Sequence, residues 1–322
     1  MSRPPLLVLA GPTASGKTAA GLHLARRLGG ELVGADSVQV YRGFDIGSAK
    51  PSVEELGGIP HHLLDVLDPD ESIDAMGFAR LADRAIEAIA ARDRVPIVVG
   101  GTGLWIRALV RGLVDVPPPD PAIRGRLEAE AKAAGAPALH ARLAEVDPLS
   151  AEAVHPNDAL RIVRALEVFE QTGRPLGELR AEHALGAPRY PTLLVVLERD
   201  KDELEGRIEA RLDAMLEADW IDEVRGLLGR WPRTARAFGS VGYKEIVAHL
   251  EDAVPLDETR RRIRKSTRVY ARRQRTWFRS EPGVGWRTRA EGLMDDEGLA
   301  RVRAFLEGEG GPGESGPPLA AS

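Results

Sequence analysis

Short apolar runs alternate with amphipathic segments along the first hundred residues. Continuous apolar runs are typical of buried parallel strands, and three are present: Leu6–Ala10, Leu32–Ala35 and Val95–Val99. Over Lys17–Leu28 and Phe78–Ala91, apolar residues recur at three- and four-residue spacing, which predicts two helices. The alternation of strands and helices predicts an α/β fold, in which helices cover both faces of an open parallel sheet.

The pattern changes at a proline-rich connector, residues 115–121. From Ala122 to about Ala187 the apolar positions keep helical spacing, and no strand pattern occurs. A strand pattern returns at Thr192–Leu197, and helical patterns follow over Lys201–Arg230 and Glu258–Arg279. A helical insertion between two parts of one α/β core is the simplest interpretation.

The chain is therefore divided into four parts. Residues 1–116 form the first part of the α/β core, residues 117–188 the helical insertion, and residues 189–306 the second part of the core. Residues 307–322 are rich in glycine and proline. Because such a composition buries too little apolar area to offset the entropy of ordering, we expect a disordered tail.

Composition excludes some kinds of site. The chain has 322 residues and no cysteine, which excludes disulfides, thiolate zinc sites and cysteine nucleophiles. The first apolar run is too short for a signal peptide or a membrane span, so we expect a cytoplasmic protein without membrane contact. The net charge of −5 gives no support to nucleic-acid binding, so a local basic surface would have to provide it.

A phosphate-binding loop follows the first predicted strand. The pattern G-x-x-x-x-G-K-[ST] is matched completely by Gly11, Pro12, Thr13, Ala14, Ser15, Gly16, Lys17 and Thr18. Backbone amides converge on an anion in such a loop, the lysine adds a charge, and the threonine hydroxyl suits Mg²⁺. The alternative is a glycine-rich turn that only joins a strand to a helix. The complete pattern between a strand and a helix favours a P-loop NTPase-like core that binds polyphosphate.

Two more strand ends are expected beside this loop, because ligands of open α/β sheets bind beyond the carboxyl ends of the strands. The second strand leads into Asp36, and the third leads into Thr102. Three roles suit Asp36: a Mg²⁺ ligand, a base toward a second substrate, or a turn cap. Thr102 suits either the site or the cap of the next helix.

Positive charge is concentrated in the last long helical pattern. Ten basic residues and no acidic one lie between Thr259 and Arg279. A stripe at helical spacing consists of Arg260, Arg264, Arg268, Arg272, Arg275 and Arg279. The stripe could follow a phosphate backbone, or it could be a solvated face or pair with acidic residues of the chain. Trp277 and Phe278 favour core packing, whereas His61 and His62 suit the site or the structure equally.

Several ordered motifs together resemble the tRNA dimethylallyltransferases, or isopentenyltransferases (IPP transferase family). They occupy residues 11–18, 36–51, 60–65, 100–105, 155–167, 241–245 and 272–278, so the resemblance extends from Leu6 to about Arg279. It implies a P-loop α/β core with a helical insertion. It also implies transfer of a dimethylallyl group from dimethylallyl diphosphate to N6 of adenosine 37, in tRNAs reading codons that start with U.

The resemblance implies roles for individual residues. Asp36 corresponds to the general base that takes the N6 proton, Arg211 to an arginine that contacts the diphosphate, and Thr18 to a residue near Mg²⁺, the expected cofactor. The expected contacts with the tRNA anticodon stem-loop are Asp36, Ser37, Val38, Gln39, Thr102, Arg124, Leu160, Arg161, Ile162, Val163, Arg164, Gly239, Ser240, Val241, Gly242, Tyr243 and Lys244. We expect a monomer.

Two departures and three alternatives accompany this resemblance. Trp105 stands where tyrosine is common, and the zinc module of the eukaryotic members is absent. A P-loop kinase for a small metabolite would use Asp36 on a hydroxyl group but needs no long basic stretch. A prenyltransferase of free AMP, ADP or ATP needs neither the insertion nor the basic helix. In a non-catalytic RNA-binding module, Asp36 would be dispensable.

Overall fold

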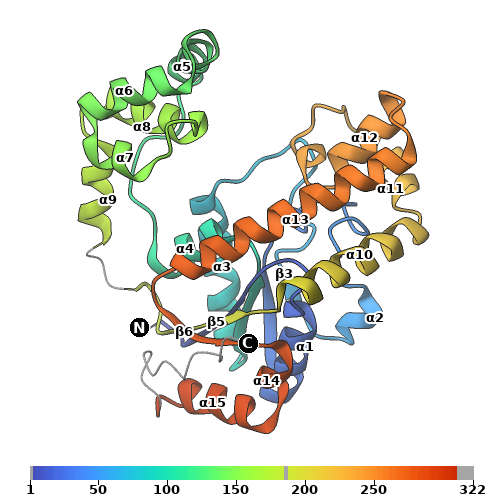
Figure 1. Ribbon diagram of the computed structural model, residues 1–322. Helices are drawn as coiled ribbons and strands as arrows, with labels where there is room; N and C mark the ends of the chain where they lie inside the picture. The colour runs from blue at the N-terminus through green and yellow to red at the C-terminus, as the bar shows by residue number, and fades with distance from the viewer. Residues whose placement is uncertain (1–2, 185–187, 310–322) are drawn as a thin grey trace. The chain divides into compact units, whose positions relative to one another are not determined.

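A six-stranded sheet carries the phosphate-binding loop in the computed structural model, which describes residues 3–184 and 188–309 (Figure 1). Its strand order is β3-β2-β4-β1-β5-β6, and all neighbouring strands are parallel. The strands are β1 Leu6–Ala10, β2 Gly30–Ala35, β3 His61–His62, β4 Val95–Gly100, β5 Thr192–Leu197 and β6 Val284–Thr288. The α/β class and the parallel sheet predicted from the sequence are confirmed.

The chain separates into two compact units, residues 1–110 with 188–322 and residues 111–187. The helices of the first unit are α1 Lys17–Leu28, α2 Val53–Leu56, α3 Ala75–Ala90, α4 Gly103–Arg111, α10 Lys201–Glu217, α11 Trp220–Leu228, the 3₁₀ helix η1 Arg236–Gly239, α12 Tyr243–Glu251, α13 Leu256–Ser280, α14 Ala290–Met294 and α15 Asp296–Leu306. The last residue of α4 lies at the boundary between the units. None of the described helices is long and apolar enough to cross a membrane.

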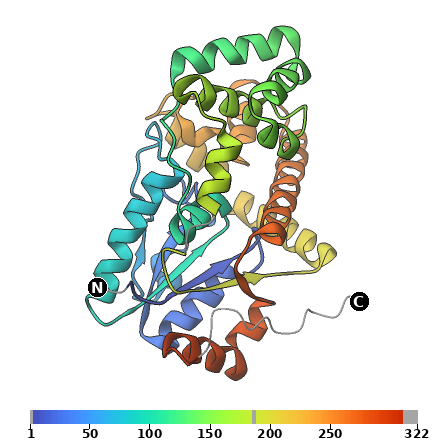
Figure 2. The same cartoon turned by 90° about the vertical axis from the view of Figure 1, so that its left-hand side faces the viewer.

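Side chains on one face of the sheet form the larger core. Because successive residues of a strand point to opposite faces, Leu7 and Leu9 of β1 point to the same side as Ile97 of β4 and Val195 of β5. Helices α1, α14 and α15 pack on this side (Figure 2). Helix α3 contacts β2 and β4 and covers the opposite face. Both faces are thus covered, which explains the continuous apolar runs.

The second unit has a core of its own. It contains α5 Pro121–Ala134, α6 Ala136–Val146, α7 Pro148–Ala153, α8 Ala159–Thr172 and α9 Leu176–Ala184. Its buried residues, among them Leu143, Ile162 and Leu166, come from these helices and from Val154, which follows α7, and Val114 and Val116 pack against them. The predicted helical insertion therefore exists, and it begins six residues earlier than the predicted residue 117.

Three features differ from the sequence prediction. The pattern over Lys201–Arg230 forms two helices, since Asp219 adopts a left-handed conformation with φ of 63° between them. The edge strands β3 and β6 were not predicted, because β3 has only two residues and β6 mixes buried with half-buried positions. Helices α14 and α15 were also missed. The expected disordered tail lies outside the described residues, except for residues 307–309.

A substitution in the insertion core should affect that unit alone. Leu166 of α8 is 1% exposed, so Leu166→Ala should cost about 2–5 kcal/mol of stability. Leu160 lies in the first turn of the same helix and is 72% exposed, so Leu160→Ala should change stability by no more than about 0.5 kcal/mol. Hydrogen exchange should accelerate over α5–α8 and not in β1 or β4. Equal acceleration in the sheet would show that the two units unfold together.

Candidate active site

Backbone conformation shapes the phosphate loop between β1 and α1. Gly11 has φ of 146°, and a Cβ there would lie 2.5 Å from the carbonyl oxygen of Leu197 on the neighbouring strand. Gly16 precedes α1 with φ of 96°. Side-chain-bearing residues rarely adopt these conformations. The two glycines of the motif therefore allow the loop to pass β5 closely and to enter α1.

Lys17, the first residue of α1, is half-buried, and its ammonium interacts electrostatically with two charged side chains. Burial lowers its pKa to about 8; the negative charge of Asp36 opposes this effect, and the positive charge of Arg211 adds to it. Its Nζ donates a hydrogen bond to the carbonyl oxygen of Pro12, 2.6 Å away. A buried cation is stabilised by an anion placed beside it, so this environment favours the binding of a phosphate group.

A cavity of about 260 Å³ opens beside the loop within the first unit. Polar groups on its wall come from Thr13, Asp36 and Arg211. The apolar side chains on its wall are Val38, Ile208, Leu212, Met215, Trp220, Val241 and Ile263. The cavity is therefore polar where Thr13, Asp36 and Arg211 line it, which suits an anion, and apolar elsewhere, which suits a small hydrocarbon group.

Asp36 follows β2 and lines this cavity. Its Oδ1 accepts hydrogen bonds from the backbone N–H groups of Val38, 2.9 Å away, and Gln39, 3.3 Å away. The turn-cap role considered from the sequence is therefore present, but it occupies one carboxylate oxygen only. Among the described residues, none donates a hydrogen bond to Oδ2, so this oxygen can accept a proton from a ligand in the cavity.

Thr102 connects the turn after β2 with the start of α4, at the carboxyl ends of the strands. Its Oγ1 accepts a hydrogen bond from the N–H of Ser37 at 3.1 Å, and its carbonyl oxygen accepts from Trp105 and Ile106 at the start of α4. Tyr270 of α13, which sequence reasoning missed, also lines the cavity and hydrogen-bonds Thr102. Burial raises the pKa of Tyr270, and the charge of Asp36 raises it further, so its hydroxyl stays protonated near the carboxylate.

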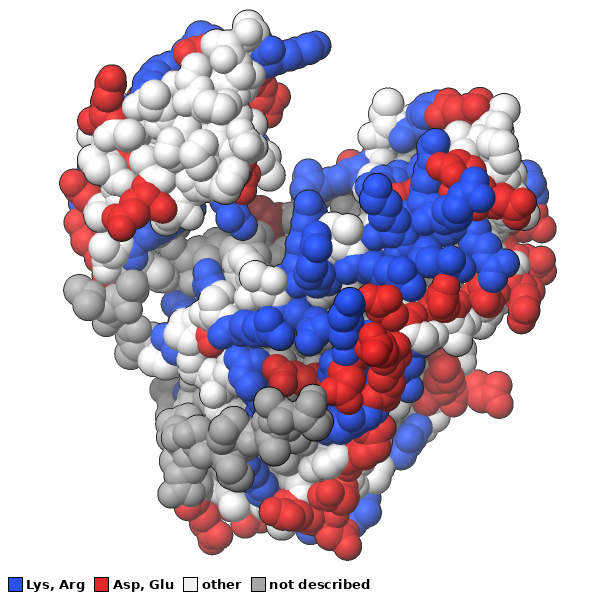
Figure 3. All heavy atoms as spheres, in the orientation of Figure 1, with Lys and Arg blue, Asp and Glu red and all other residues white. Residues whose placement is uncertain are grey.

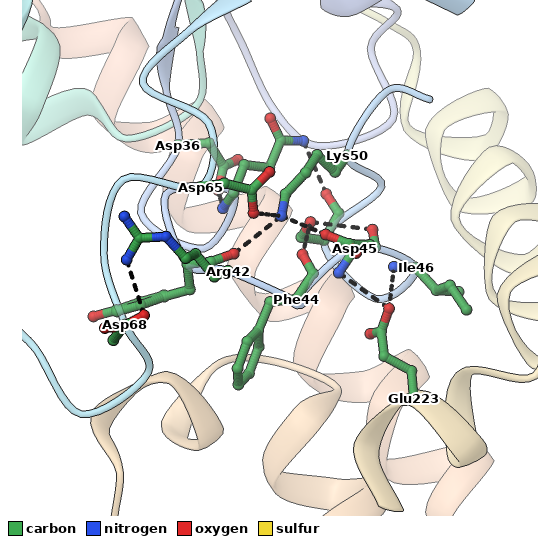
Figure 4. Close-up of polar contacts among 12 residues, drawn as sticks. Asp36, Arg42, Phe44, Asp45, Ile46, Lys50, Asp65, Asp68 and Glu223 are labelled. Atoms are coloured by element: carbon green, nitrogen blue, oxygen red, sulfur yellow. Dashed lines mark hydrogen bonds and ion pairs between the residues drawn. The ribbon is translucent and has the colours of Figure 1, made fainter. Parts of the chain in front are cut away.

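Residues 42–50 form a loop that pairs with no strand (Figure 4). Its residues Gly47, Ser48 and Ala49 line the cavity. The ammonium of Lys50, whose side chain is 6% exposed, lies between the carboxylates of Asp45 and Asp65. Glu223 of α11 accepts from the N–H of Asp45, 3.0 Å away, and the N–H of Ile46, 2.6 Å away. Neither anchor was predicted, since each joins residues that no local pattern connects.

Helix α10 directs two arginines at the phosphate loop. Nη1 of Arg211 donates to Oγ1 of Thr13, at 3.5 Å, and Nε of Arg207 donates to the carbonyl oxygen of Ala14, at 2.8 Å. Burial and the charge of Arg207 lower the pKa of Arg211, and the charge of Asp36 opposes them. Arg207 lies one helical turn before Arg211; this spacing is a signal from which it could have been predicted.

The expected contact residues 239–244 serve two purposes. Gly239, Ser240 and Val241 line the cavity. Tyr243, in contrast, is fully buried and donates its hydroxyl hydrogen to Glu223 at 2.7 Å. Gly242, with φ of 90°, packs so closely on Trp220 that a Cβ would lie 2.2 Å from the ring. The side chain of Lys244 is 52% exposed, 3.7 Å from the carboxylate of Glu245.

The expected contacts of the second unit divide in the same way. Leu160 and Arg161 are exposed, but Ile162 and Val163 are buried in the insertion core. Arg124 and Arg164 bind the carboxylate of Glu167, which is fully buried. Burial alone would raise the pKa of Glu167, yet the bonds from Arg164 and Arg124 outweigh burial and lower it. Arg124 therefore joins α5 to α8, whereas Arg164 pairs with Glu167 within α8 and also donates to the carbonyl oxygen of Pro117.

The basic stripe of α13 consists of two different halves. Arg260, Arg264 and Arg268 pair with acidic residues of α10, which are Asp213, Glu209 and Glu205 respectively. Arg261 and Arg262 pair with Glu258 on α13 itself. Among the described residues, no ion pair involves Lys265, Arg272, Arg273, Arg275 or Arg279. Figure 3 shows the resulting basic surface along α13, with acidic side chains bordering it over α10.

The remaining candidates are structural. His62 Nε2 lies 2.7 Å from a carboxylate oxygen of Glu31. Burial and the neighbouring His62 lower the pKa of His61 to about 4, so its ring is neutral. Phe278 is 1% exposed, as the core interpretation predicted. Trp277 lies under the guanidinium of Arg107, 4.3 Å from the ring centre.

Comparison with known proteins identifies the family. A family model described as IPP transferase matches residues 39–281. The chain is 53% identical over 281 residues to the tRNA dimethylallyltransferase of Anaeromyxobacter dehalogenans (strain 2CP-1), covering 87% of this chain and 92% of that one. To that of Sorangium cellulosum it is 52% identical over 276 residues, covering 86% and 88%.

Solved structures agree. A tRNA isopentenylpyrophosphate transferase from Bacillus halodurans has 38% identity and a TM-score of 0.69, with 95% of this chain and 97% of that one covered. A eukaryotic dimethylallyltransferase acting on tRNA has 26% identity and a TM-score of 0.79, with 97% and 82% covered. Ordered motifs, fold and overall similarity lead to one conclusion: this chain belongs to the IPP transferase family, the tRNA dimethylallyltransferases.

Proposed function

We propose that the cavity beside the phosphate loop is where this chain transfers a dimethylallyl group from dimethylallyl diphosphate to N6 of adenosine 37, in tRNAs reading codons that start with U. The observation that carries this proposal is the convergence of Lys17, Arg211 and Asp36. Asp36 and Arg211 line one cavity together with Thr13 of the phosphate loop, and the charges of Lys17 and Arg211 each interact with that of Asp36. A phosphate-binding site and a base are thereby combined in one cavity.

The leaving group would be stabilised by the phosphate loop. As the carbon–oxygen bond of the allylic diphosphate breaks, negative charge grows on the diphosphate. We expect the N-terminus of α1, with Lys17 and Arg211, to interact with that charge. The apolar wall around Ile208 and Leu212 suits the hydrocarbon part of the substrate. No water attack is needed, because the acceptor is the adenine amine.

Asp36 would act as the general base. The lone pair of the adenine amine is delocalised into the ring, so the amine is a poor nucleophile unless its proton is removed as the new carbon–nitrogen bond forms. Oδ1 of Asp36 is fixed by two backbone N–H groups, and Oδ2 is the oxygen proposed to accept the N6 proton. The adenine has to leave its stack to reach this oxygen, as single-stranded loop bases do readily.

Mg²⁺ is the proposed cofactor, and the side chains present fit it as a complex with the diphosphate. Among the described residues, no group of three or more His, Cys, Asp or Glu forms a metal site. In P-loop proteins the Ser or Thr hydroxyl after the loop lysine binds Mg²⁺ beside the substrate phosphates, so the Thr18 hydroxyl would be a protein ligand. When bound, the ion would neutralise charge on the departing diphosphate.

The C-terminal half of α13 is the proposed surface for the tRNA backbone near the anticodon stem-loop. Arg272, Arg273 and Arg279 are exposed, and no described acidic residue neutralises them. The N-terminal half is compensated by α10. This local imbalance accounts for RNA binding by a chain of net charge −5. A monomeric state and a cytoplasmic location complete the proposal.

The function is tested by label transfer. With Mg²⁺, the purified protein should move label from dimethylallyl diphosphate onto adenosine 37 of unmodified tRNA. Asp36→Asn keeps the oxygen that caps the turn but removes the base, so turnover should fall about 10²–10⁴-fold, while tRNA affinity in filter binding stays nearly unchanged. Label on AMP alone would overturn the tRNA assignment, and equal losses of turnover and affinity would overturn the role of Asp36.

Diphosphate binding should depend on pH through Lys17. Its pKa of about 8 means that the ammonium loses its proton above that pH in the free protein. Because the bound anion favours the charged form, the Kd for dimethylallyl diphosphate should rise about tenfold per pH unit above pH 8. Titration calorimetry without tRNA measures this. Lys17→Arg should give a flat profile, and a flat profile in the native protein would contradict the assignment.

The two halves of α13 should differ in their response to salt. Arg272→Ala or Arg279→Ala removes a free cation, so the salt dependence of tRNA affinity should become shallower by about one phosphate contact per substitution. Arg260→Ala and Arg264→Ala are matched controls on the same helix, since their partners on α10 already neutralise them. If Arg260→Ala and Arg264→Ala reduced the salt dependence of tRNA affinity and Arg272→Ala and Arg279→Ala did not, the proposed tRNA surface would be wrong.

A further inference from the structure

We propose that Gln274 is a positioning residue that fixes the phosphate loop relative to the turn that carries Asp36. This inference rests on the proposed function of the two segments. Gln274 lies on the inner face of α13 and is 6% exposed. Its Oε1 accepts a hydrogen bond from the N–H of Thr13, 2.8 Å away, and its Nε2 donates one to the carbonyl oxygen of Gly101, 2.9 Å away.

The side chain bridges two strand ends just beyond their last paired residues. Strand β1 and strand β4 are neighbours, and Ala10 pairs with Gly100. Thr13 and Gly101 follow these residues, so backbone pairing no longer holds them together. The glutamine amide supplies one donor and one acceptor at this point, where the sheet stops supplying them. A Cβ on residue 101 would lie 2.2 Å from Nε2, so the contact requires glycine there.

From Gly101 the connection continues to Asp36. The next residue, Thr102, donates its N–H to the carbonyl oxygen of Ala35 at 3.2 Å and accepts from the N–H of Ser37 at 3.1 Å. Thr102 thus holds the residues on both sides of Asp36. Through Gly101 and Thr102, the amide of Gln274 joins the loop expected to bind the leaving group to the turn that carries the expected base.

The bridge also determines which amides the loop can offer. The N–H of Thr13 is committed to Gln274, while the hydroxyl of Thr13 faces Arg211. The amides available to the diphosphate are therefore those of later loop residues. A purely structural glutamine would stabilise the fold without affecting one ligand more than another. A positioning glutamine predicts separate effects on turnover, diphosphate binding and tRNA binding.

The test uses Gln274→Met, which keeps the length of the side chain but removes both hydrogen bonds. We expect kcat to fall about 100-fold, because misplacement of reacting groups by about 1 Å has this effect. The Kd for inorganic diphosphate should rise, the tRNA Kd should stay within about twofold, and hydrogen exchange should accelerate over residues 11–18. Unchanged kcat and loop exchange would overturn the proposal, as would a parallel loss of tRNA affinity and thermal stability.

Two further variants keep the test decisive. Gln274→Glu retains the acceptor for Thr13 but places an oxygen against Gly101, so it covers the case in which the methionine variant does not fold. Gln171→Glu is the control, because Gln171 of the insertion likewise donates to a backbone carbonyl, that of Pro118, and its kcat should not change. Diphosphate affinity and loop exchange need no turnover. They therefore report on Gln274 even if the native protein fails to prenylate tRNA.

Discussion

The rest of the site depends on the electrostatic interactions of the Lys17 ammonium with Asp36 and Arg211. Burial disfavours its charge, Asp36 favours it, and Arg211 opposes it. An anion bound beside Lys17 would favour its charged form, and the loop that presents Lys17 is fixed by its backbone conformation and by contacts with α10. Glycines 11 and 16 set its path, and α10 contacts it through Arg207 and Arg211. The contacts of Arg207 and Arg211 thus hold the loop in place around the Lys17 ammonium, whose charge a bound anion would stabilise.

Much of the fold could be predicted because local signals agreed with tertiary packing. Helix α1 begins at Lys17 and ends at Leu28, as predicted, since left-handed glycines bound it on both sides. Strand β5 also has the predicted bounds. The missed elements lack such signals. The break at Asp219 requires a left-handed aspartate within a helical pattern, and β6 is an edge strand that is buried at only some positions.

The candidate site was predictable only where its residues form a motif. The phosphate loop, Asp36 and Thr102 come from strand ends, which the order of elements brings together. Tyr270 belongs to a helix far along the chain, and nothing in its neighbourhood connects it to Asp36. Motif matching also cannot tell one face of a helix from another: Ile162 and Val163 lie within a matched segment, but they face the insertion core.

Glu223 has a consequence for how the cavity behaves. Its carboxylate accepts from the N–H groups of Asp45 and Ile46, with that of Gly47 at 3.5 Å. Successive amides around an anion form the same kind of nest that a phosphate loop offers to its ligand. The loop of residues 42–50 thus holds an anion that the protein itself supplies, and its residue Gly47 lines the cavity. This part of the cavity wall therefore needs no ligand to hold it, because Glu223 already binds its backbone amides.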